Sequence, residues 1–145
     1  MANHHVAAFD RTLQKTHIWI GGITNQMGWE EHEKGYVALR AVLHALRDRL
    51  PPDEAVDLAA QLPMLIRGIY FEGWRPSNKP LKYRHKEQFI EQVRREAPSV
   101  TDDEAERAVS AVFHQLSTEI DGGEVEDVRN AMPQEIREMW PVDGL

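Results

Sequence analysis

The segment Tyr36–Leu50 reads YVALRAVLHALRDRL and decides the fold class of this chain. Its apolar residues recur every three or four positions, which places them on one face of a helix. They are Tyr36, Leu39, Val42, Leu43, Leu46 and Leu50. The arginines between them fall on the opposite side. The segment is therefore predicted to be an amphipathic helix that buries one face.

Helices of the same kind are expected along almost the whole chain. Pro51–Pro52 ends the first helix and begins another, because proline fits a first helical turn but not a helix interior. Pro63 breaks that second helix, and an apolar helical stripe runs over Leu62–Phe71. Other helices are expected over residues 8–26, 85–97 and 101–120, the last opened by a capping box of Thr101 and Glu104. After a turn at Asp121–Gly123, helical spacing continues and is interrupted by Pro133. Alternating strand patterns are absent, so the predicted fold class is all-α.

The two halves of the sequence repeat each other. A shift of 70 residues aligns residues 39–74 with 109–144 without a gap, and nine of the 36 pairs are identical, where chance would give a couple. The first members of these pairs are Ala41, Val42, His44, Leu46, Glu54, Asp57, Pro63, Ile66 and Arg67. We therefore predict two pseudo-repeated units of three to four helices, about residues 8–74 and 85–144, joined by a basic connector at 75–84. Units of ~70 residues are marginal alone, so both are expected to share one core in a single bundle-like domain spanning 1–145.

One helix differs between the repeats. Met64, Leu65 and Gly68 in the first copy align with Gln134, Glu135 and Glu138 in the second. The Leu62–Phe71 helix is thus apolar almost all round and should be buried on more than one face. We expect it to fill the centre between the repeats, since a domain buries its most apolar helix first. The alternative is that it forms the contact of a homodimer.

Composition narrows the class of protein. The chain has 145 residues, 41% hydrophobic and 28% charged residues, and no cysteine, which excludes disulfides, thiolate metal sites and cysteine nucleophiles. No apolar run reaches the ~20 residues of a membrane span, and the N-terminus lacks the regions of a signal peptide. The expectation is a soluble, cytoplasmic protein. Its net charge of −7 argues against nucleic-acid binding.

Two histidines are the candidates for a metal site. His44 and His114 occupy equivalent positions in the two repeats and would have to meet across a pseudo-twofold axis. The ligand spacings typical of helical metal sites do not occur. The competing interpretation, which we favour, is that each histidine bonds a neighbouring turn of its own repeat.

Two charged triplets also occupy equivalent positions. They are Glu54, Asp57 and Arg67 in the first repeat, and Glu124, Asp127 and Arg137 in the second. As a functional site, each would form half of an anion-binding cleft, with arginine as a bidentate clamp. As structure, each arginine would brace consecutive helices by pairing with an acid of its own repeat. The repetition of the whole set favours the brace.

The connector is a basic island in an acidic chain. Residues 75–86 hold five bases and no acid, while the rest of the chain carries a charge of −12. The bases are Arg75, Lys79, Lys82, Arg84 and Lys86. They could contact an anionic partner, or merely form a solvated tether attracted to the acidic helices. Pro76 and Pro80 predict an irregular surface loop here.

Three stretches resemble a known family. They are residues 39–51, residues 61–74 with their ending Tyr-Phe-Glu-Gly-Trp74, and Phe9–His17. Together they resemble the bacterial family catalogued as domain of unknown function 2267. The resemblance implies a small, all-helical bacterial protein and brings no activity, cofactor or catalytic residue with it.

The sequence contains no phosphate-binding glycine loop, nucleophile elbow or zinc-protease motif, so an enzyme is not the expected class. The leading hypothesis is a non-enzymatic interaction module with an unknown protein partner and no cofactor. The alternative is a small-molecule or metal-binding protein that uses a cleft between the repeats, with the His44/His114 or the Arg67/Arg137 pair inside it.

Overall fold

The computed structural model describes residues 4–141, and this part of the chain consists of helices joined by loops, without a strand. The helices are α1 (Ala7–Met27), α2 (His32–Arg49), α3 (Pro52–Ala59), α4 (Met64–Phe71), α5 (Lys86–Glu96), α6 (Asp102–Glu119), α7 (Gly122–Asn130) and α8 (Gln134–Arg137). The predicted all-α class is confirmed. None of the helices in this range is both long and apolar enough to cross a membrane.

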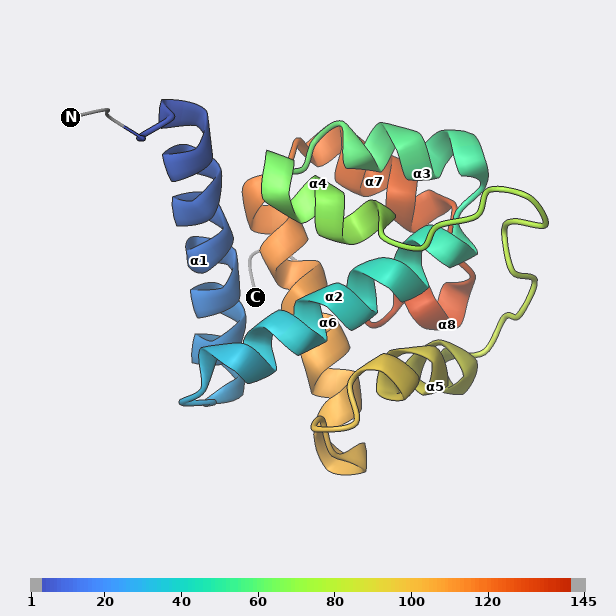
Figure 1. Cartoon of the computed structure of the whole chain (residues 1–145). Helices are drawn as coiled ribbons and strands as arrows, with labels where there is room; N and C mark the ends of the chain where they lie inside the picture. The colour runs from blue at the N-terminus through green and yellow to red at the C-terminus, as the bar shows by residue number, and fades with distance from the viewer. Residues whose placement is uncertain (1–3, 142–145) are drawn as a thin grey trace.

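The central element is α2, the helix that the opening segment predicts, although it begins at His32 rather than Tyr36. It contacts α1, α3, α4, α5 and α6, and these helices surround it in Figure 1. The prolines act as expected, since Pro52 lies in the first turn of α3 and Pro63 is the N-cap of α4. Because Gly35 lacks a side chain, Thr24 of α1 can lie against it; a Cβ there would be 2.5 Å from the Thr24 methyl.

The capping box of α6 is present and does more than begin a helix. Thr101 and Glu104 bond each other as predicted. The Glu104 carboxylate also accepts hydrogen bonds from the Trp29 indole at 2.7 Å and from the Lys34 ammonium at 2.9 Å. These bonds, the one from Trp29 first, lower the pKa of Glu104 to about 2. The turn between α1 and α2 is thereby fastened to the start of α6.

The helix starts follow the 70-residue shift. α2 and α6 begin at residues 32 and 102, α3 and α7 at 52 and 122, and α4 and α8 at 64 and 134. The match fails at both ends of the repeat, because α1 and α5 begin at residues 7 and 86, and because α8 is a single turn where α4 has two. Whether the two halves also share one three-dimensional arrangement stays a prediction.

The core is one apolar cluster, and both halves of the chain contribute residues to it. Seven apolar residues at helical spacing in the two halves are fully buried, namely Leu43, Leu46, Ile66, Val112, Phe113, Leu116 and Ile136. Ile69 is buried only in part. The central position predicted for the Leu62–Phe71 helix is wrong. α4 buries Ile66 and Tyr70, while Met64 and Leu65 stay 47% and 40% exposed, because that face turns towards α1 rather than towards the second repeat.

Candidate functional site

The apolar stripe of α1 extends beyond the part of the helix that the rest of the molecule covers. The stripe consists of Phe9, Leu13, Thr16, Ile20, Ile23 and Met27. From Thr16 onward its residues are buried. Phe9 and Leu13 are 61% and 51% exposed, although they continue the same face. Residues 7–15, here called the α1 overhang, therefore present an apolar face without cover.

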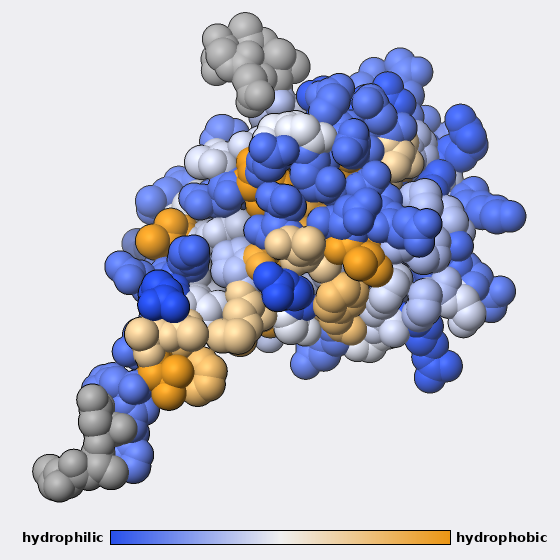
Figure 2. Space-filling view, turned by 90° about the horizontal axis from the view of Figure 1, so that it is seen from above, coloured by the Kyte–Doolittle hydropathy of each residue, from blue (hydrophilic) through white to orange (hydrophobic). Residues whose placement is uncertain are grey.

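The exposed face of α4 lies beside this overhang, and the two helices enclose a groove of about 540 Å³. The α1–α4 groove is lined by Phe9, Thr12, Leu13, Met64, Leu65, Gly68, Ile69 and Glu72. Figure 2 shows apolar residues gathered on the projecting start of the chain and on the adjacent face of the body. The groove lies within the first repeat, not between the two repeats.

Polar contacts hold both ends of α4 in place. At its N-terminus, the amide of Leu65 donates to the Thr12 hydroxyl of α1 at 2.8 Å. At its C-terminus, Arg47 of α2 donates to the carbonyls of Tyr70 and Glu72 at 2.5 and 2.6 Å. Arg47 is only 5% exposed, and it meets the helix end where unpaired carbonyls favour a cation. One wall of the groove is thus fixed by side chains from two other helices.

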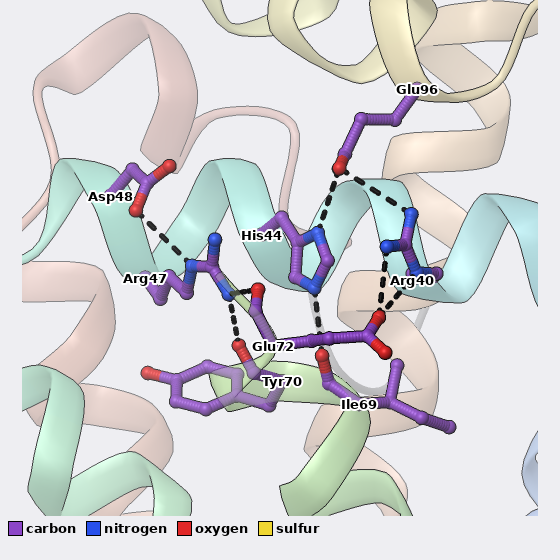
Figure 3. A network of polar contacts seen from close by, with 8 residues as sticks. All are labelled: Arg40, His44, Arg47, Asp48, Ile69, Tyr70, Glu72 and Glu96. Atoms are coloured by element: carbon purple, nitrogen blue, oxygen red, sulfur yellow. Dashed lines mark hydrogen bonds and ion pairs between the residues drawn. The ribbon is translucent and has the colours of Figure 1, made fainter. Parts of the chain in front are cut away.

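His44 supplies a third contact to the same helix end, shown in Figure 3. Its Nε2 lies 2.7 Å from the carbonyl oxygen of Ile69, and its Nδ1 lies 2.8 Å from the Glu96 carboxylate of α5. Both ring nitrogens of His44 are therefore engaged, one by a backbone carbonyl and the other by a carboxylate. His44 therefore binds a neighbouring turn, as expected, and neither ring nitrogen is left for a metal.

Arg40 joins this network to the groove. Its guanidinium donates to Glu72 at 2.8 Å and to Glu96 at 3.4 Å. The hydrogen bond from Arg40 lowers the pKa of Glu72, whose side chain stands at the end of the groove. The imidazole of His114, the counterpart of His44 on α6, is half-buried and has no polar partner in the described part of the chain, so the contact with a neighbouring turn expected for it is wrong. The described residues contain no cluster of three side chains able to hold a metal ion.

The two arginines of the triplets are braces, but the acid partners expected for them are wrong. Arg67 donates to the carbonyls of Ala59 and Leu62, at 3.0 and 2.9 Å. Arg137 donates to the carbonyl of Met132 at 3.1 Å. The physical reason is that the turns before Pro63 and Pro133 leave the carbonyls of Leu62 and Met132 without a helical partner, and a guanidinium can supply the missing donor.

The acids of the triplets meet each other instead. The carboxyl groups of Glu54 on α3 and Glu124 on α7 face one another, and the Oε2 atom of each is buried without a donor. Burial first, and then the Glu54 carboxyl, raise the pKa of Glu124 to about 8. At neutral pH the pair of carboxyls therefore tends to hold a proton between them. Asp57 and Asp127 remain exposed, and their charges raise the pKa of Glu124 further.

The basic connector is an irregular loop, as predicted, and its backbone is anchored to the end of α2. The amide of Leu81 donates to the Asp48 carbonyl, and Arg49 donates to the Tyr83 carbonyl, both at 2.8 Å. Lys86 belongs to α5 and pairs with Glu106 at 3.2 Å. The other bases have no acidic partner within the described residues; they are Arg75, Lys79, Lys82 and Arg84.

The sequence model of one protein family, described as "Uncharacterized conserved protein (DUF2267)", matches residues 16–139. The chain belongs to this family. The match covers most of the chain and confirms the resemblance to DUF2267 seen in the sequence. The comparison with curated proteins found no match. The matched range begins at Thr16, where α1 first becomes buried, so the α1 overhang lies outside it.

Proposed function

We propose that this DUF2267 protein is a non-enzymatic protein-interaction module whose α1–α4 groove binds an amphipathic helix. The observation that carries the proposal is the stripe of α1, which continues over Phe9 and Leu13 after the body has ceased to cover it. A second apolar face, that of α4, stands beside it. Contiguous exposed apolar surface of this kind is typical of protein interaction sites.

The shape of the groove favours a helix as occupant. It is an open trough between two neighbouring helices, and helix-in-groove recognition uses apolar residues at positions i, i+3, i+4 and i+7 of the bound helix. Gly68 lines the trough, and nothing lies within 4 Å of where its Cβ would be. A glycine in mid-helix costs about 1 kcal/mol relative to alanine, and here it leaves room for another backbone to approach.

The groove is also preorganised. Thr12 fixes the start of α4, and His44 and Arg47 fix its end. A binding surface that is already held in its bound form loses little entropy on association. The polar groups of the lining serve this purpose, because the Thr12 hydroxyl accepts from Leu65 and the Glu72 carboxylate accepts from Arg40.

The proposal is tested with a photo-crosslinking amino acid, p-benzoylphenylalanine, placed at Leu65 in the cells that naturally produce the protein. The matched control carries it at Val56 on α3, which is 49% exposed and does not line the groove. We expect crosslinks at Leu65 that map, by mass spectrometry, to one face of a helix in the captured protein. They should disappear when Gly68→Leu fills the groove. Equal capture at Leu65 and Val56 would refute the proposal.

A further inference from the structure

We infer that the helix bound in the α1–α4 groove is α1 of a second copy of this chain, so that the protein is a twofold dimer. The inference rests on the proposed function and specifies its partner. It requires that one surface serve both as ligand and as receptor, because the same patch of each copy meets the other across a twofold axis.

The surface has this self-complementary form. The α1 overhang is a ridge, on which every residue from Ala7 to Lys15 is exposed except Thr12, which is half-buried. The hollow of about 540 Å³ lies directly beside the ridge, with Gly68 in its lining. Two copies related by a twofold axis can each place the ridge, led by Phe9 and Leu13, in the hollow of the other. The two α1 and two α4 helices would then form a four-helix contact.

The apolar area matches what a stable dimer needs. The large apolar side chains offered by each copy are Val6, Phe9, Leu13, Met64 and Leu65, between 40% and 61% exposed. Together they present roughly 490 Å², if a large side chain has roughly 200 Å² in all. Since apolar atoms supply about 60% of an interface, this corresponds to about 820 Å² per copy, close to the ~800 Å² of standard interfaces.

Charge favours a second copy over a strongly charged partner. The chain as a whole carries −7, so two copies repel over most of their surface. Among the residues that line the groove, the charged one is Glu72, and Arg40 already pairs with it. Such a lining favours neither an acidic nor a basic helix. Two copies of this nearly uncharged surface can contact each other without repulsion.

The overhang also needs cover for its own stability. Its two and a half turns extend the buried part of α1, and most of the stability of a helix in a protein comes from tertiary packing of its apolar face. Within the molecule α4 is the element that supports this part of α1. A second copy supplies the missing packing wherever the protein itself is present.

The oligomeric state of the full chain tests whether the protein is a dimer. Analytical ultracentrifugation should give twice the chain mass of 16.7 kDa for the parent protein. Leu13→Arg, which charges the ridge, and Gly68→Leu, which fills the hollow, should each weaken self-association about 100-fold or more. Gly68→Leu should also raise the melting temperature of the monomer, because it replaces a helical glycine, so loss of the dimer cannot be ascribed to unfolding. Val56→Arg is the exposed control and should remain dimeric.

A parent protein that stays monomeric at about 100 μM, or a dimer equally weakened by Val56→Arg, would overturn the inference. The proposed function fails separately. A monomeric chain whose Leu65 crosslinks map to a helix of another protein refutes the second copy and keeps the interaction module. A monomeric chain whose Leu65 captures no more than Val56 refutes both.

Discussion

Replacing Glu124 by glutamine should remove a pH dependence of stability that the carboxyl pair between α3 and α7 creates. The pKa of Glu124 is about 8 in the folded protein, against 4.5 for an ordinary glutamate, so the folded state binds its proton more tightly than the unfolded state. Stability from this proton is fully present below pH 4.5 and is lost as the pH rises to 8. At 1.36 kcal/mol per pKa unit the loss is at most ~5 kcal/mol. Water reaches part of Glu124 and screens its charge, which reduces the expected loss to about 2 kcal/mol.

The assay is urea unfolding at pH 5 and pH 8.5, followed by the fluorescence of the four tryptophans. Between these two values the parent protein should lose about 2 kcal/mol more than Glu124→Gln, because the amide cannot ionise. Glu54→Gln should act in the same direction, since it removes the carboxylate that repels ionised Glu124. Glu138→Gln, at an exposed carboxyl of the second repeat, is the control and should follow the parent. If the parent and Glu124→Gln lose stability equally, the two carboxyls do not share a proton and the reasoning is refuted.

Three other changes separate buried contacts from exposed ones. His44→Ala should lower the free energy of unfolding by about 2–4 kcal/mol, measured in urea at pH 6. The substitution removes the imidazole that contacts the Ile69 carbonyl and the Glu96 carboxylate. A loss below about 0.5 kcal/mol would contradict the network. Leu46→Ala should cost about 2–5 kcal/mol by calorimetry, since the side chain is fully buried, and a melting temperature within a couple of degrees of the parent would show that the core face is misassigned. Changing Lys79, Lys82 and Arg84 together to glutamine should leave the melting temperature nearly unchanged, because they have no acidic partner, and a large drop would show that the connector supports the fold.

Spacing and prolines predicted the helices and the core well because both signals are local. Leu43 and Leu46 lie on the face that a 3.6-residue period selects, and both are fully buried. Pro52 and Pro63 mark helix starts because the missing amide hydrogen acts on the chain within one turn. The start of α2 carries no comparable signal, and the predicted start was four residues late.

Contacts between distant segments were harder to predict because residue type does not reveal a backbone acceptor. Arg67 looks like the partner of an acid in the sequence, yet it bonds the carbonyls of Ala59 and Leu62 in the turn before α4. Glu54 and Glu124 are identical members of one repeated pair, and nothing in their spacing indicates that they face each other.

The exposure of residues along an apolar stripe is also hard to predict from the sequence. Phe9 and Leu13 have the spacing of buried residues, and only the extent of the neighbouring helices determines where the cover ends. A signal for the groove was present in the differences between the repeats. Met64, Leu65 and Gly68 replace polar residues of the second copy, and they are the part of α4 that the molecule leaves open.

Because α4 is held at its two ends, its position does not depend on the side chains of its outer face. Thr12 at the start, and His44 and Arg47 at the end, hold backbone groups and leave the side chains at positions 64, 65 and 68 uninvolved. Substitutions at those three positions can therefore alter what the groove recognises while the helix stays where it is. At α8, Arg137 bonds the carbonyl of Met132, while the helix and its C-cap carry Gln134 and Glu138 instead. The same scaffold can thus acquire new binding preferences without having to be rebuilt.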